Sequence, residues 1–169
     1  MSESTKQMKL DRRCDILEKK LARNIAWIAA ADSRVAPLFA INTAMLGVIA
    51  ALVPKPSMWE KLPLVTAVLS ALCLGGSLVC IFLTTMPRTA GPKGSLVFFG
   101  GIVQRDVQQY LQAMQELKEE DYLTDLAAQV HRNAEIASTK FKWVGYAMRC
   151  TLIGAVPWLI TVFLLYQTR

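Results

Sequence analysis

The chain has 169 residues, 53% of them hydrophobic and 19% charged, with a formal net charge of +6. This length fits about one domain. The positive charge could indicate a nucleic-acid partner, but the charges lie outside three long apolar runs. Membrane topology explains that distribution more simply, so we expect no nucleic acid as a partner.

Residues 1–34 predict a cytoplasmic amphipathic helix, because apolar side chains recur there at spacings of three and four. The stripe consists of Leu10, Cys14, Leu17, Leu21, Ile25 and Ile28. No early apolar region with a small-residue cleavage site is present, so we expect the first membrane span to act as its own signal. The four cysteines form no CxxC or Cys/His cluster, and we expect neither a disulfide nor a metal site.

Residues 35–85 predict a transmembrane helical hairpin. The runs 35–53 and 62–83 carry no charge and approach the roughly 20 residues that a spanning helix needs. Pro54, Lys55 and Pro56 end the first run and predict a short turn before the second.

Residues 86–144 predict a cytoplasmic loop followed by a helical region. Two further stripes occur there, and with the first they predict a small bundle of cytoplasmic helices. One stripe consists of Val103, Val107, Tyr110, Met114 and Leu117; the other of Leu123, Leu126, Val130, Ala134, Ala137 and Phe141. The latter helix can run unbroken into a third span within residues 145–169, which end in a short C-terminus.

Lys and Arg residues gather before the first span and between the second and third. The positive-inside rule therefore places the N-terminus and the middle segment in the cytoplasm. Trp59, Trp158 and Tyr166 fit the outer aromatic belt, and Trp27 and Trp143 the inner one. The predicted fold class is an all-α membrane protein with three transmembrane helices and cytoplasmic amphipathic helices.

Polar residues inside the predicted spans are candidate functional positions, because each is costly in hydrocarbon. Asn42 and Thr43 suit either interhelical hydrogen bonds or a pore lining. Gly75, with Ala71, forms a small-xxx-small pair that favours helix packing. Pro157 removes a backbone hydrogen bond, which gives either a hinge or simply a bent shape.

No catalytic constellation is visible, so we expect neither enzymatic activity nor a cofactor. The single histidine, His131, has no nucleophile or carboxylate pair at catalytic spacing. Asp32 is interpreted as a helix cap and Arg34 as a topology anchor. The mixed donors of His131, Asn133 and Lys140 would suit a small anionic ligand held between helices.

Three segments resemble the Pycsar transmembrane effector family (PycTM) of bacterial antiphage defence. They are ADSRVAPLFAINTAMLG, LVFFGGIVQRDVQQYLQAM and EEDYLTDLAAQVHRNAEIASTKF, and they occur in this order with matching hydropathy. The family motifs fall on these positions: Asp32, Arg34, Asn42, Phe99, Gly100, Tyr110, His131, Asn133 and Lys140.

The resemblance implies an effector at the bacterial inner membrane that senses cyclic UMP or cyclic CMP made by a partner cyclase on phage infection. The resemblance also implies that the helical region within residues 86–144 is the sensor. The effector then impairs the inner membrane and causes abortive infection. Several copies would be needed for a pore, so we expect a homo-oligomer. The candidate ligand-binding residues are Arg34, Phe99, Tyr110, His131, Asn133 and Lys140. Two alternatives stay open: a membrane effector gated by another nucleotide signal, and a membrane scaffold that docks a protein.

Overall fold

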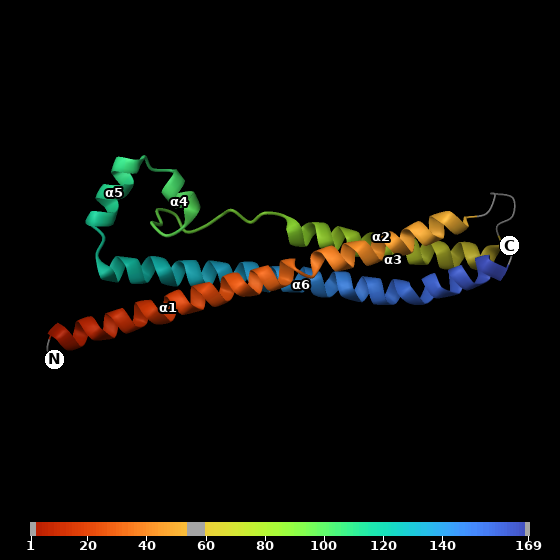
Figure 1. Ribbon diagram of the computed structural model, residues 1–169, viewed down its shortest axis with the longest axis horizontal. Helices are drawn as coiled ribbons and strands as arrows, with labels where there is room; N and C mark the ends of the chain where they lie inside the picture. Colours follow the sequence, from red (N-terminus) through yellow and green to blue (C-terminus); the bar gives the residue numbers. More distant parts are fainter. Residues whose placement is uncertain (1–2, 54–59, 168–169) are drawn as a thin grey trace. The chain divides into compact units, whose positions relative to one another are not determined.

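The computed structural model describes residues 3–53 and 60–167, and every regular element in those residues is a helix (Figure 1). The helices are α1 (Glu3–Asp32), α2 (Val35–Leu52), α3 (Lys61–Thr85), α4 (Phe99–Val103), α5 (Val107–Gln115) and α6 (Glu119–Gln167). The all-α prediction is therefore confirmed. The predicted turn at Pro54, Lys55 and Pro56, and the belt residue Trp59, lie outside the described residues.

Three helical segments are long and apolar enough to cross a membrane: Gln7–Leu52, Lys61–Thr85 and Glu119–Gln167. They contain the three predicted spans. The helices α2 and α3 are apolar around their whole circumference, which is the pattern of a helix surrounded by protein or lipid. Side chains such as Leu72, Leu152 and Phe163 are more than half exposed in the single chain, as lipid-facing residues are.

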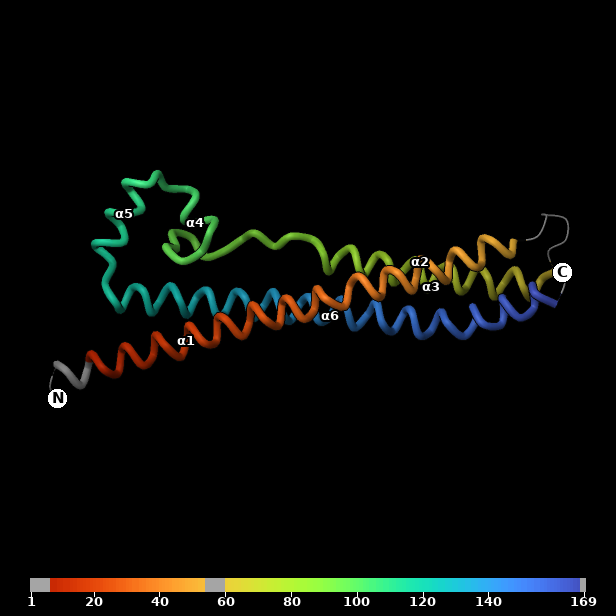
Figure 2. The backbone as a smooth tube through the Cα atoms, in the orientation of Figure 1, coloured from red at the N-terminus to blue at the C-terminus, as the bar shows by residue number. Residues whose placement is uncertain are grey.

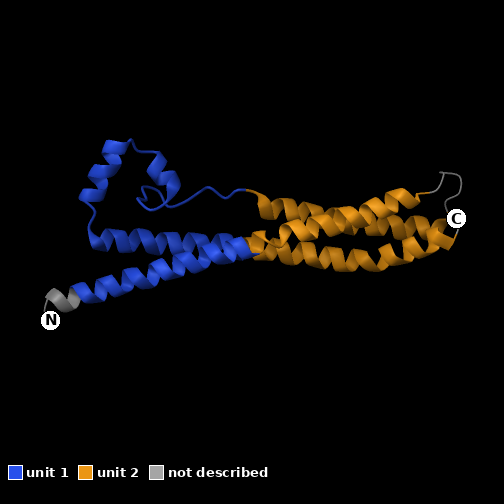
Figure 3. Ribbon diagram, viewed as in Figure 1, with its two compact units in different colours: residues 1–30, 87–138 blue, residues 31–86, 139–169 orange. Residues whose placement is uncertain are grey.

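The chain divides into two compact units, coloured separately in Figure 3. Unit 1 comprises residues 1–30 and 87–138, and unit 2 comprises residues 31–86 and 139–169. Both α1 and α6 contribute residues to each unit, so two of the three chain connections between the units lie within helices. The four-segment division expected from the sequence stays a prediction.

In unit 2, α2 and the second half of α6 run parallel, and α3 runs antiparallel to both (Figure 2). Their contacts establish this order. Asn42 and Met45 of α2 meet Thr151 and Trp158 of α6, in the same sequence direction. Along α3 the direction reverses, since Thr66, Ser70 and Ser77 contact Thr161, Gly154 and Ala147. The start of α2 and the end of α3 therefore lie at one end of the bundle.

In unit 1, α1 packs against the first part of α6. The Asn24 amide, 5% exposed, donates to the carbonyl oxygen of Val130 at 2.8 Å, and the Tyr122 hydroxyl donates to Glu18 at 2.9 Å. Leu126 and Ala137 of the predicted α6 stripe are buried, whereas Ala134 is exposed.

The predicted middle stripe is wrong in two respects. It is not one helix, because the chain breaks between α4 and α5. Asp106 caps α5 there by accepting from the Gln109 amide at 2.8 Å, and the Gln109 side chain pairs back with the Asp106 amide. This reciprocal capping starts a new helix. Nor is the stripe buried, since Val103 is 80% and Val107 75% exposed.

Candidate functional site

A loop of unit 1 is fixed to α6 by one carboxylate. Asp125 accepts hydrogen bonds from the backbone amides of Leu96 at 2.8 Å and Val97 at 3.2 Å. Arg132, two turns further along α6, donates to the Ala90 carbonyl oxygen at 2.8 Å. Backbone groups of an irregular segment need such partners when they are partly buried. The loop is thereby held at two points along the same helix.

Ser95 lies at the centre of this loop and is only 4% exposed. Its hydroxyl oxygen accepts from the amides of Val97 and Phe98, and from the Gln129 side-chain amide at 3.1 Å. An added Cβ on Gly101 would come within 2.3 Å of the Ser95 carbonyl oxygen, so only glycine fits where α4 passes the loop.

Arg105 closes the loop from the other side. Its guanidinium donates to the carbonyl oxygens of Gly94, Ser95 and Gly101 at 2.8–3.2 Å. Gly94 has a φ of +75°, a left-handed conformation that glycine adopts without strain. These hydrogen bonds all lie within unit 1 and hold the loop in a defined conformation.

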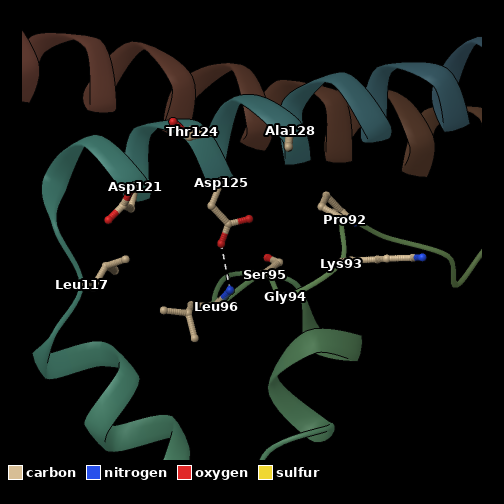
Figure 4. A pocket seen from close by; sticks show the side chains of 10 residues that line it. All are labelled: Pro92, Lys93, Gly94, Ser95, Leu96, Leu117, Asp121, Thr124, Asp125 and Ala128. Carbon is tan, nitrogen blue, oxygen red and sulfur yellow. Dashed lines mark hydrogen bonds between the residues drawn. The ribbon is translucent and has the colours of Figure 1, made fainter.

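Beside the loop is a cavity of about 340 Å³, shown in Figure 4. It is lined by Pro92, Lys93, Gly94, Ser95, Leu96, Leu117, Asp121, Thr124, Asp125 and Ala128. The lining contains two carboxylates and one lysine, and in Figure 4 the Lys93 side chain extends away from the carboxylates. The cavity therefore favours hydrogen-bond donors over anions.

None of the six predicted ligand residues lines this cavity. Phe99 is 60% exposed, and its ring contacts that of Phe98 at a tilt of 53°, with ring centroids 4.5 Å apart. The Tyr110 hydroxyl donates to the Leu96 carbonyl oxygen at 3.3 Å. Asn133 donates along its own helix to Gln129, and the His131 side chain, 78% exposed, lies 3.7 Å from Glu135. These four residues belong to unit 1 and do not form one cluster.

The other two predicted ligand residues, Arg34 and Lys140, belong to unit 2, where the corner between α1 and α2 contacts α6. Lys140 donates to the Asp32 carboxylate at 2.5 Å. The Arg34 guanidinium lies over the Phe141 ring, 5.4 Å from its centroid. Asp32 is the last residue of α1, and α2 has no side-chain cap, so the predicted capping role of Asp32 is wrong. Its position favours the pairing with Lys140.

A second cavity, of about 330 Å³, adjoins this ion pair and is lined by Asp32, Val35, Ala36, Thr85 and Lys140. Val35 begins α2 and Thr85 ends α3, so the cavity lies at that end of the unit 2 bundle. The Lys140 side chain is 11% exposed and that of Asp32 is 45% exposed. The ammonium is thus buried, whereas its carboxylate partner is accessible to solvent.

A seam of polar side chains runs through the unit 2 bundle. Asn42 is fully buried and bonded to Thr151, and Ser77 bonds the same threonine at 2.9 Å. The Thr161 hydroxyl donates both to the Thr66 hydroxyl oxygen and to the Pro157 carbonyl oxygen. Each buried polar side chain that the structure describes in unit 2 has a hydrogen-bond partner within that unit.

The other candidate residues in the predicted spans, Thr43, Gly75 and Pro157, contribute no side chain to this seam. Thr43 is exposed and bonds only to backbone oxygens of its own helix. An added Cβ on Gly75 would meet nothing within 4 Å, so Gly75 is not needed for packing within one chain. Pro157 is buried inside α6, which continues through it.

Sequence reasoning missed Gly154 and the loop-holding residues Ser95, Asp125 and Gln129. A Cβ on Gly154 would lie 2.9 Å from the Cys73 Cβ, so glycine lets α3 and α6 approach closely. The polar positions 125, 129 and 132 share one face of α6, a helical spacing that could have indicated a polar contact. Their role was hidden because EEDYLTDL also has the composition of a helix start.

Two groups in unit 1 have perturbed acidity. Burial, together with the hydrogen bond to Glu18, raises the pKa of Tyr122 to about 12. Burial is the main cause, and the negative charge of Glu18 the next, of a raised pKa of the Cys14 thiol. The raised pKa disfavours the reactive thiolate. Among the residues that the structure describes, no group of His, Cys, Asp and Glu is placed to hold a metal ion.

Comparison with known proteins gives one family. The family model of the Pycsar effector protein domain, PycTM, matches residues 16–167. Neither the curated proteins nor the solved structures gave a match. The match spans most of both units, the candidate spans Lys61–Thr85 and Glu119–Gln167, and the first candidate span from residue 16 onward. The chain therefore belongs to the PycTM family of Pycsar effectors, which act in antiphage defence.

Proposed function

We propose that this effector binds a cyclic pyrimidine nucleotide, cyclic UMP or cyclic CMP, and responds by impairing the inner membrane of the infected cell. The observation that carries the proposal is the family match over residues 16–167, since Pycsar effectors in general answer to a cyclic nucleotide from a partner cyclase. The outcome would be abortive infection, in which the host stops growing before phage can spread.

The division of the chain supports this assignment. Unit 2 has the apolar exterior of a membrane bundle, whereas unit 1 carries the charged helices and the loop held by Asp125. Because α1 and α6 supply residues to both units, a ligand that prefers one arrangement of these helices can change the packing of the spans. Such a ligand must bind the two arrangements with different affinity to shift their populations.

The polar seam supports a resting bundle that does not conduct. Asn42, Ser77 and Thr151 satisfy one another inside a single chain, so they are not available to line a water-filled pore in this arrangement. Membrane damage then requires the bundle to open or several copies to assemble.

The test combines cells and purified protein. Expression of the chain with its active cyclase should collapse the membrane potential on phage infection, whereas a catalytically inactive cyclase should not. In vitro, the protein in lipid nanodiscs should bind cyclic UMP or cyclic CMP in preference to cyclic AMP and cyclic dinucleotides. An intact membrane potential at saturating cyclic pyrimidine nucleotide contradicts the proposal. Preference for a cyclic dinucleotide would identify another signal.

A further inference from the structure

We infer that the cavity beside Lys140 in unit 2 is a binding site for a phosphodiester monoanion, which replaces Asp32 as the partner of Lys140. Both a cyclic nucleotide and a phospholipid headgroup carry this group. For the nucleotide, the inference rests on the proposed function and assigns its phosphate to a site; for the lipid, it is independent of that function.

The Lys140 ammonium can donate more hydrogen bonds than the one it donates to Asp32. An ammonium group has three N–H donors. Among the described residues Lys140 has one hydrogen-bond partner, Asp32, although the residue as a whole is only 9% exposed. A buried charge is stable only when it is paired and well hydrogen-bonded. The adjoining cavity of about 330 Å³ is where a further acceptor would reach the other two donors.

The existing partner of Lys140 is also replaceable. Asp32 has a side-chain exposure of 45%, so it regains hydration when it leaves Lys140. An anion entering from the cavity would take over the ammonium without leaving a buried carboxylate uncompensated. Exchange of one anion for another therefore costs less than creating a new buried ion pair.

Arg34 provides a second cation at the same end of the bundle. It directly precedes Val35, which lines the cavity. Its guanidinium lies over the ring of Phe141, the residue that follows Lys140 in the sequence. No ion-pair partner of Arg34 occurs among the described residues. Guanidinium groups bind phosphate oxygens by paired, charge-assisted hydrogen bonds. With Lys140 and Asp32, the cluster has an excess of one positive charge.

Charge distinguishes this cavity from the one in unit 1. The unit 1 cavity has Asp121 and Asp125 with one lysine, and so repels a monoanion. The unit 2 cavity has Lys140 and Asp32 in its lining, and Arg34 directly precedes the lining residue Val35. Its position where α2 begins and α3 ends is also the depth at which a spanning bundle meets lipid headgroups.

The site has a direct route to the spans. The contact between Asp32 and Lys140 joins the end of α1 to α6, immediately before α2 begins. Replacing Asp32 by a ligand removes that link between the two helices. The phosphodiester would therefore loosen the bundle where α2 begins. The polar seam lies further along the same helices.

The experiment uses the full chain in phosphatidylcholine nanodiscs and measures the Kd of cyclic UMP and cyclic CMP. We expect Lys140→Gln and Arg34→Gln to weaken binding about tenfold or more, since each removes a charge-assisted contact. Lys142→Gln, which changes an exposed lysine two positions away, should leave Kd unchanged. Asp32→Asn removes the competing anion and should tighten binding several-fold, a gain that misfolded protein cannot give.

A second arm replaces part of the lipid with phosphatidylglycerol, omits nucleotide, and counts retained lipid by native mass spectrometry. The same order of variants there supports a lipid diester at the site. If the wild type binds nucleotide and all four variants match it, the site is refuted and the proposed function stands. If the wild type binds no nucleotide but lipid retention follows the order, the proposed function fails and the site stands. Absence of the order in both arms overturns the inference.

Discussion

Asn42 on α2 and Thr151 on α6 are separated by 109 positions in the chain and joined by a hydrogen bond of 3.0 Å between Nδ2 and Oγ1. The Thr151 hydroxyl also lies 2.9 Å from the Ser77 hydroxyl on α3. One threonine therefore connects all three helices of unit 2. Hydrogen bonds of this kind provide specificity to helix packing where the hydrophobic effect cannot distinguish helix from lipid.

Replacing Asn42 by Ala should destabilise the protein by about 1 kcal/mol, since interhelical hydrogen bonds in membrane proteins contribute about 0.6 kcal/mol on average and about 1.7 kcal/mol at most. The measurement is chemical unfolding in detergent. A double-mutant cycle with Thr151→Val should show a coupling of similar size, because the two side chains bond each other. The control is Thr43→Val, whose hydroxyl bonds only to its own helix and which should change little. Additive effects of the Asn42 and Thr151 variants would contradict the assignment.

Much of the fold could be predicted, because uniform hydropathy marks a span independently of its neighbours. The predicted runs 35–53 and 62–83 correspond to Val35–Leu52 and Lys61–Thr85. The middle stripe was misjudged because Val103 and Val107 have helical spacing across a break. The capping by Asp106 that causes the break is invisible to a count of apolar residues.

The candidate sites could be predicted only in part. Arg34 and Lys140 were named from charge and resemblance, but their proximity depends on the register between the α1–α2 corner and α6. No local pattern gives a register across more than a hundred residues. The role of Asp125 was missed for a similar reason, since its partners are backbone amides, which every loop possesses.

Gly154→Ala should destabilise the bundle by about 1–3 kcal/mol, the usual effect of an extra methyl group in a packed interior. Its Cβ would be 2.9 Å from that of Cys73, on the facing helix. Gly75→Ala is the matched control, since its Cβ meets nothing within the chain and alanine favours helix. Thermal unfolding in the same detergent gives the comparison. Equal stability of both variants would show that α3 and α6 are not in close contact at Gly154.

Asp125→Ala should release the loop of unit 1, because the amides of Leu96 and Val97 lose their acceptor. Hydrogen exchange at these two amides should accelerate at least tenfold, while exchange in α2 and α3 should remain unchanged. Asp121→Ala, in the same cavity but without a loop contact, is the control. Unchanged exchange at Leu96 in the Asp125 variant would mean that Ser95 and Arg105 hold the loop without it.

The raised pKa of Tyr122 should lower the free energy of unfolding at alkaline pH. Burial raises its pKa from 10 to about 12, so the folded protein holds the phenolic proton more tightly than the unfolded chain does. The stabilisation is complete below pH 10 and is lost as the pH rises towards 12. Tyr122→Phe should therefore show a shallower fall in the free energy of unfolding across this range. Parallel pH profiles of the variant and the wild type would contradict the assigned pKa.

Leu126 and His131 lie on the same helix, α6, but one side chain is buried and the other is exposed. Leu126 is 1% exposed, so Leu126→Asp buries an unpaired carboxylate and should prevent unit 1 from folding. His131 lies five positions further along α6 with a 78% exposed side chain, and His131→Ala should leave the thermal midpoint unchanged. Its effect on nucleotide affinity then reports contact with ligand alone. A weakened Kd would place part of the nucleotide against unit 1, whereas an unchanged Kd would leave His131 outside the binding site.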